Sequence, residues 1–246
     1  MTGSVRDNGT GGTFDRMAVR GWLEQHAEAE YRDFSAGLTP GLQNILGVRL
    51  PLLRKYAREL IAGDWRGFLR DYPAIWHEEV MLQGMVLAGA PMPPEERLEW
   101  LRGYLPRIDN WAVCDAVAAS FDLRGEEKRL MWDFLLGLQY AEWAFSRRFM
   151  LVMLLMYYLE PPYPAGWSAE DFCRLVEDTP GGEYYVDMAR AWLLSVLFVK
   201  QRELGQRYLP QSRLDDFTYN KTLRKMLESR RLPAEDREFI RSLRRK

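Results

Sequence analysis

The sequence predicts an all-α protein on three observations. Apolar residues recur every three or four positions through most of the chain, for example between Met17 and Phe34, which is the spacing of one helical face. Prolines and glycines separate these segments. No segment keeps the alternation of apolar and polar residues that is typical of half-buried strands. We therefore expect helices joined by short loops.

Caps and helix breakers predict the limits of the individual helices. Pro51 suits the first turn of a helix, Asp64 can cap a short helix that Pro73 ends, and Ser168 with Asp171 is close to a capping box. A loop that contains Pro40, Gly41 and Gly47 should follow the first helix. The expected helices span residues 14–36, 48–62, 64–72, 75–90, 95–104, 110–121, 124–138, 142–158, 168–178, 184–200, 216–231 and 234–244.

The more apolar helices recur at a regular interval. They begin near Ile75, Trp111, Trp143 and Tyr184, roughly 30 to 40 residues apart, which is the period of helical-pair repeats. This predicts a curved α-solenoid of HEAT-like helical pairs, and the alternative is an irregular α bundle. We expect one domain over residues 14–246 after a disordered lead-in of residues 1–13, which is rich in Gly, Thr and Ser.

Composition and charge exclude several classes of protein. The two cysteines, Cys114 and Cys173, lie in apolar patterns and predict free buried thiols, and the two histidines predict no metal site. The longest apolar run, residues 149–159, is about half the length of a membrane span. We expect a cytoplasmic monomer without a cofactor or a membrane partner, since no phosphate loop or nucleophile–base spacing is present either.

The net charge of −1 gives no global reason to expect a polyanionic partner, but it is unevenly distributed. The segment from Arg213 to Lys246 has 11 Lys and Arg residues and 6 Asp and Glu residues, a net charge of +5, which leaves −6 for the preceding chain. A basic end on a mildly acidic body suits a local contact with an anion.

The segment Asp109 to Asp115 contains the first candidate site residues. Asp109 or Asn110 can cap a helix, and Trp111 and Asp115, four residues apart, share one helical face. Other apolar helices also carry polar insertions, and stacked in parallel they could line one cleft for a cationic or aromatic group beside a phosphate. These insertions are Glu78-Glu79, Arg147-Arg148, and Asp187 and Arg190 with Trp192.

Each of these insertions also has a purely structural interpretation. Arg147 and Arg148 would pair with nearby acids such as Glu142, and Trp192 would belong to the core. An aspartate in the second turn of a helix is often solvated or stabilised by the helix dipole.

An ordered set of segments resembles the AlkD-like family of DNA alkylation-repair proteins, which are HEAT-like-repeat DNA glycosylases. The resemblance covers nearly all of the chain beyond about residue 14. Its segments are Ile45 to Arg49 with Pro51, Glu78 to Gly84, Asn110 to Asp115, Arg148-Phe149 with Val152 to Leu154, Tyr184 to Val186, Ala191 to Leu194, Tyr219 to Lys221, and Glu228 to Arg231.

The resemblance implies removal of cationic alkylpurines, typically 3-methyladenine and 7-methylguanine, from double-stranded DNA. It implies that Asp115 is the catalytic carboxylate, Arg148 the active-site arginine, and Trp111 and Trp192 the indoles around the sugar and phosphate of the lesion. The expected DNA contacts are Arg147, Lys221, Arg224, Lys225, Arg230 and Arg231.

Two positions depart from the family pattern. Leu38 stands where better-known members carry a tyrosine, and Met156 stands where they carry a lysine. Both departures remove polar groups from the expected groove, and they favour an alternative function. In that alternative, the chain is a non-catalytic HEAT-like module that binds nucleic acid or a protein.

Overall fold

The computed structural model describes residues 15–246, and every regular element in that range is a helix. The predicted all-α class is therefore confirmed. The lead-in predicted over residues 1–13 lies outside the described residues. The chain divides into two compact units, Met1–Met92 (unit 1) and Pro93–Lys246 (unit 2); the single domain expected over residues 14–246 stays a prediction. No described helix is long and apolar enough to cross a membrane.

The described part of unit 1 contains five helices, and its first helical region differs from the prediction. A single helix over residues 14–36 is wrong, because the chain breaks at residues 26–28. There the backbone N–H of Glu28 donates to the carbonyl of Gly47 at 3.0 Å, a tertiary bond that local periodicity does not reveal. The helices are α1 (Arg16–Gln25), α2 (Ala29–Leu38), α3 (Leu50–Ala62), α4 (Trp65–Asp71) and α5 (His77–Gly89).

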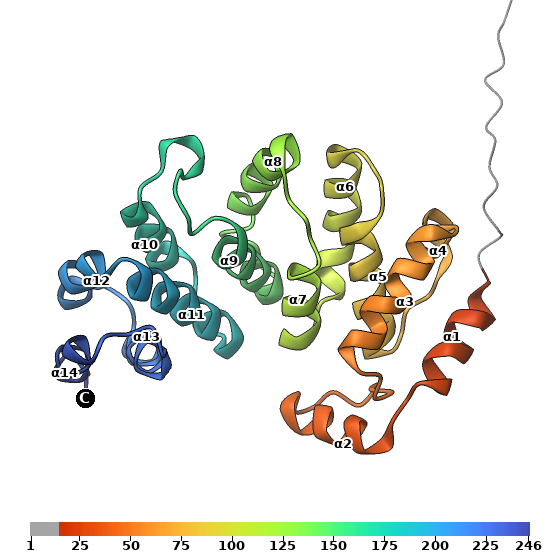
Figure 1. The fold of residues 1–246 in the computed structure, drawn as a ribbon, viewed down its shortest axis with the longest axis horizontal. Coiled ribbons are helices and arrows are strands. Elements are labelled where there is room, and N and C mark those ends of the chain that lie inside the picture. The colour runs from red at the N-terminus through yellow and green to blue at the C-terminus, as the bar shows by residue number, and fades with distance from the viewer. Residues whose placement is uncertain (1–14) are drawn as a thin grey trace, which may run out of the picture. The chain divides into compact units, whose positions relative to one another are not determined.

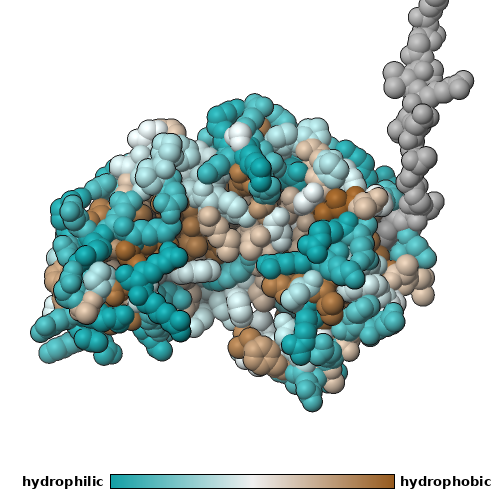
Figure 2. All heavy atoms as spheres, in the orientation of Figure 1, coloured by the Kyte–Doolittle hydropathy of each residue, from teal (hydrophilic) through white to brown (hydrophobic). Residues whose placement is uncertain are grey.

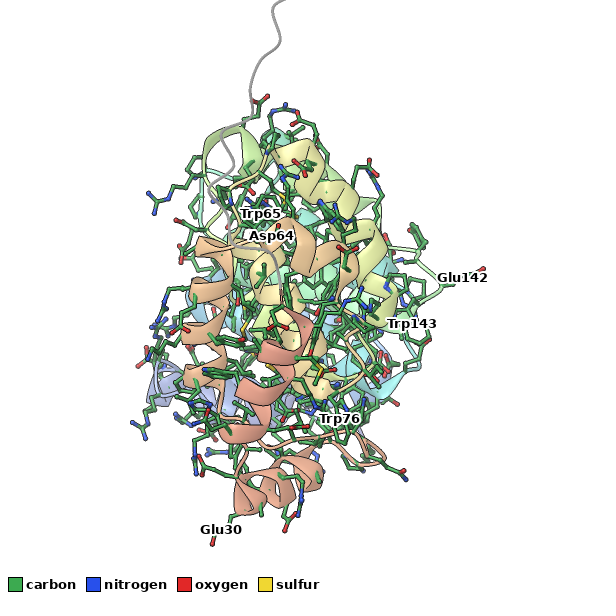
Figure 3. The ribbon with its side chains drawn as sticks, turned by 90° about the vertical axis from the view of Figure 1, so that its right-hand side faces the viewer. Glu30, Asp64, Trp65, Trp76, Glu142 and Trp143 are labelled. Atoms are coloured by element: carbon green, nitrogen blue, oxygen red, sulfur yellow. The ribbon has the colours of Figure 1, made fainter. Side chains whose placement is uncertain are left out.

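Local signals place the later helices of unit 1 correctly. Pro51 lies in the first turn of α3, and Asp64 caps α4 by accepting a bond from the N–H of Gly67 at 2.8 Å; Figure 3 labels Asp64 beside Trp65 at this helix start. Helix α5 is buried on almost all sides, as its apolar sequence predicts.

The two glutamates of α5 hold the loops of unit 1. The Glu78 carboxylate accepts bonds from the backbone N–H groups of Leu46, Gly47 and Val48 at 2.9, 2.7 and 3.2 Å. Glu79 accepts bonds from Arg20 and from the Tyr72 hydroxyl, both at 2.8 Å. Burial raises the pKa of Glu79, but its hydrogen bonds, those from backbone amides foremost, outweigh burial and lower the pKa. These carboxylates therefore have structural partners inside unit 1.

Unit 2 contains nine α-helices in the described chain, one of which the sequence did not predict. The missed helix, α12, has seven residues and contains Gly205, which weakens any helical signal. A Cβ at Gly205 would lie 2.9 Å from the Cβ of Phe198, so the glycine allows close packing. The helices are α6 (Pro94–Tyr104), α7 (Trp111–Ala118), α8 (Gly125–Leu136), α9 (Ala144–Tyr157), α10 (Ala169–Asp178), α11 (Tyr184–Lys200), α12 (Arg202–Tyr208), α13 (Asp216–Glu228) and α14 (Ala234–Ser242).

Four helices of unit 2 form a row. Helix α7 packs on α9, α9 on α11 and α11 on α13, while α6, α8 and α10 lie on one side of this row (Figure 1). The middle members are almost wholly apolar and buried, with Phe149, Leu151 and Leu194 fully enclosed. The row brings side chains from four distant sequence segments to one edge of unit 2.

Buried arginines tie neighbouring helices of unit 2 together. Arg190 of α11 donates to the Val176 carbonyl of α10 and to Asp187, both at 3.0 Å, and to Asp215 before α13 at 3.3 Å. Asp187 and Arg190 are thus a buried structural pair. They do not contribute the exposed polar groups that a binding surface requires.

We predict that alanine at Gly47 destabilises the fold far more than alanine at Gly41. Both glycines have positive φ, +95° and +90°, but a Cβ at Gly47 would lie 2.4 Å from the Glu28 carbonyl, whereas the space at Gly41 is open. Gly41→Ala should cost about 1–2 kcal/mol from backbone strain alone, and Gly47→Ala about 3 kcal/mol or more. Chemical denaturation measures both, and equal losses would contradict this reading of the Gly47 contact.

Candidate functional site

Helix α7 begins as the sequence predicts, with Asn110 rather than Asp109 as its cap. The Asn110 side chain accepts a bond from the N–H of Val113 at 3.0 Å and donates to Asp109 at 2.7 Å. Trp111 is the first helical residue and Asp115 follows four residues later, and both are half-buried. Apart from Ala112, the other residues of the helix are buried, so Trp111 and Asp115 lie on its accessible side.

Asp115 is held by Arg148 of the neighbouring helix α9. The Nε and Nη2 atoms of Arg148 donate to the two carboxylate oxygens of Asp115 at 3.0 and 2.8 Å. This two-pronged geometry is the strong form of an arginine–carboxylate pair, because both carboxylate oxygens are fixed at once. The two residues that were expected to act together are therefore in direct contact.

The remaining arm of Arg148 reaches a third helix. Its Nη1 donates to the backbone carbonyl of Tyr185 in α11 at 2.6 Å, and the guanidinium lies 6.0 Å from the Tyr185 ring centre. The Arg148 side chain is only 6% exposed, whereas that of Asp115 is 18% exposed. The carboxylate is thus the part of this ion pair that a ligand can approach.

Trp192 and Lys225 form the next part of the site, on α11 and α13. The Lys225 Nζ lies 5.8 Å from the centre of the Trp192 indole, and both side chains are half-buried. They share a pocket of about 430 Å³ with Arg230 and Arg231. The other lining residues are Ser195, Val196, Val199, Lys200, Glu228 and Ser229.

The Lys225 amine is electrostatically destabilised in its charged form. Burial is the largest cause that lowers its pKa, and repulsion from Arg148, Lys221 and Arg224 lowers the pKa further, against an opposing effect of Glu228. The influence of Arg148 on Lys225 shows that the Asp115 pair and the Trp192 pocket lie within electrostatic reach of each other.

Aromatic side chains that the sequence analysis did not assign to a site lie at the starts of α9, α11 and α13, and one of them, Tyr185, lies beside Arg148. Tyr185 is 5.8 Å from Phe145 and 5.2 Å from Tyr184, and Tyr184 is 5.9 Å from Phe217. Tyr184 and Phe217 are 54% and 42% exposed, which is unusual for large apolar side chains at helix starts. Both aromatic residues lie at the start of a helix, directly after a break between helices. This placement was the sequence signal that could have identified Tyr184 and Phe217 as exposed site residues.

Arg147 differs from the other expected DNA contacts because it is buried. It donates to the Ala141 carbonyl at 2.6 Å and to the Glu183 carboxylate at 2.5 Å, which ties the starts of α9 and α11. Glu142, an acid expected to pair with these arginines, points away from the ribbon beside Trp143 (Figure 3) and contributes only its backbone carbonyl, 3.4 Å from Arg147.

The remaining expected contacts are on the surface of α13 and the loop after it. Arg224, Arg230 and Arg231 are exposed, and Arg224 also pairs with Glu228 at 3.0 Å. Lys221 lies 5.3 Å from the Phe217 ring and, with Arg224, lines a second pocket of about 760 Å³ between α13 and α14. Hydrophilic side chains cover most of this end of unit 2 in Figure 2.

Three further side chains contribute little polar chemistry to the site. Met156 is half-buried in the last turn of α9, Leu38 is 48% exposed at the end of α2 in unit 1, and the buried Cys114 thiol has a raised pKa because burial disfavours its charged form. Across residues 15–246, no group of three or more His, Cys, Asp or Glu side chains could hold a metal ion.

In comparisons with known proteins, no protein-family model matches the chain. No curated protein sequence matches it either.

We predict a large coupling energy between Asp115 and Arg148. Each single variant, Asp115→Asn or Arg148→Met, leaves the charge of its half-buried or buried partner unpaired. The double variant should therefore lose less stability than the sum of the losses in the two single variants. The coupling in the free energy of unfolding should be about 1–3 kcal/mol. The control is the Arg129–Asp133 pair of α8, at 3.7 Å with both side chains more than 60% exposed, for which about 0.3–0.5 kcal/mol is expected. Equal coupling energies for the Asp115–Arg148 and Arg129–Asp133 pairs would contradict a special role for the Arg148 contact.

Proposed function

We propose that the protein is a DNA glycosylase that removes cationic alkylpurines, and that unit 2 carries its active site on a row of HEAT-like helical pairs. The observation that carries this proposal is the Asp115 carboxylate, which is 18% exposed and is fixed by Arg148 beside the Tyr185 ring, in the same row of helices as a basic pocket. The family resemblance of the sequence supports the same function. No cofactor is required.

The chemistry needs few protein groups because the substrate is already activated. A purine alkylated at N3 or N7 carries a positive charge, so it leaves as a neutral base without a general acid. The sugar then develops an oxocarbenium-like charge, which a nearby carboxylate stabilises. A unit charge pair at about 4 Å and an effective dielectric near 20 is worth roughly 4 kcal/mol, or nearly a thousandfold in rate.

Arg148 has two opposite effects on this carboxylate. It fixes the direction in which the oxygens point, so that little reorganisation is needed during the reaction. It also neutralises part of the negative charge that a sugar cation would meet. The guanidinium is more deeply buried than the carboxylate, so an approaching ligand meets the carboxylate oxygens first.

Base release from methylated double-stranded DNA tests the proposal directly. We expect release of free 3-methyladenine or 7-methylguanine above the rate of spontaneous depurination, measured by chromatography at low salt. Asp115→Asn should lower the rate by up to about a thousandfold while DNA binding persists.

Asp133→Asn is the matched control, because it removes an exposed aspartate of α8 in the same unit. Its rate of base release should equal that of the unsubstituted protein. Absence of any release by folded protein would contradict the proposed activity, and an unchanged rate in Asp115→Asn would exclude Asp115 from the assigned role.

Salt dependence tests the DNA contacts proposed for the basic end of α13. Each lost phosphate contact should reduce the slope of log affinity against log salt by about 0.9. We therefore expect a shallower slope for Arg230→Ala/Arg231→Ala, measured by fluorescence anisotropy with duplex DNA. Arg129→Ala, which removes an exposed cation of α8, should leave the slope unchanged; the same loss in both variants would contradict a localised contact.

The second candidate function is a non-catalytic HEAT-like module that binds nucleic acid or a protein. The specific observation in its favour is the two-pronged Asp115–Arg148 pair, which could serve only to join α7, α9 and α11. DNA binding without base release would favour this function.

A further inference from the structure

The Lys225 amine lies in a setting that suits covalent chemistry with a carbonyl. We propose that Lys225 attacks the aldehyde of an abasic deoxyribose in DNA and forms an imine with it. The inference rests on the proposed function for the source of the abasic sugar, which is the product that base removal leaves.

Within the described chain, the pocket beside Trp192 has one amine, that of Lys225, that can lose its proton and that no ion pair of its own holds in place. Two lysines and two arginines line it. Lys200 is paired with Glu160, and arginine does not lose its proton in proteins. Lys225 instead faces the indole of Trp192. Glu228, the acid that acts electrostatically on Lys225, is paired with Arg224 at 3.0 Å.

The surroundings favour the neutral amine, which is the nucleophilic form. Half-burial and the three nearby cations lower the pKa of Lys225, so more of the amine is unprotonated at neutral pH than for an ordinary lysine. Desolvation next to other cationic groups is a recognised way to activate a lysine for imine formation.

The position of the pocket also suits an abasic sugar. Arg148, which fixes Asp115, is one of the cations acting on Lys225, and their helices α9 and α13 both pack on α11, which carries Trp192. Arg230 and Arg231 on the rim of the pocket can hold the flanking phosphates.

The proposed step balances without an oxidant or a reductant. The Lys225 Nζ adds to C1′ of the ring-opened sugar, and the carbonyl oxygen leaves with both amine protons as water, so that a C=N bond replaces the C=O bond. Hydrolysis reverses the step and restores the amine. Borohydride traps the intermediate, because hydride adds to C1′ and leaves a stable secondary amine.

Borohydride trapping on a preformed abasic duplex tests the proposal. The duplex is made by enzymatic removal of a single uracil, so the assay does not require this protein to release a base. We expect a covalent protein–DNA adduct that depends on borohydride and on the abasic site. Lys225→Arg should abolish the adduct, while it keeps a cation over Trp192 and should keep duplex binding, which anisotropy checks.

Lys55→Arg is the matched control, because it makes the same substitution at an exposed lysine of α3, outside the proposed site, and should still give the adduct. No adduct with the unsubstituted protein, or an undiminished adduct with Lys225→Arg, would overturn the proposal. Base release without an adduct would reject the imine alone, and an adduct without base release would reject only the proposed glycosylase activity.

Discussion

The organisation of unit 2 depends on the guanidinium of Arg148. From α9 it reaches the Asp115 carboxylate on α7 and the Tyr185 carbonyl on α11, so one buried cation fixes three members of the row. Replacing one partner of such a pair leaves the other as an uncompensated buried charge. This costs far more free energy of folding than the loss of a surface ion pair. The same contacts fix the carboxylate that the proposed reaction uses.

The other buried arginines of unit 2 show which polar residues are structural. Arg147 and Arg190 end on backbone carbonyls and on acids of neighbouring segments. Asp115 differs because its oxygens remain partly accessible, and Lys225 differs because Glu228, the acid that acts on it, is paired with Arg224, whereas Lys200 is paired directly with Glu160. Partial exposure and incomplete neutralisation of charge, rather than polarity alone, distinguish the residues of the proposed site from the polar residues that only hold helices together.

Local chemistry made much of this fold predictable. The Asn110 and Asp64 caps, the Ser168–Asp171 capping box and the apolar periodicity act within a few residues, and so does the shared face of Trp111 and Asp115. Contacts between distant segments were not predictable from one sequence. Arg148 lies 33 residues from Asp115, and the break after α1 depends on a bond from Glu28 to Gly47. Charge patterns identified Lys225 as a cation, but only packing against Trp192 and the proximity of Arg148 reveal its lowered pKa.

In the proposed function, Asp115 stabilises positive charge on the sugar of DNA. The most direct measurement compares affinities for two duplexes, one with a cationic pyrrolidine in place of the lesion sugar and one with a neutral tetrahydrofuran. We expect the unsubstituted protein to prefer the cationic duplex by about tenfold or more, equivalent to about 1.4 kcal/mol, and we expect Asp115→Asn to lose this preference. Equal affinities for the two duplexes, or a preference that survives in Asp115→Asn, would contradict this role of Asp115.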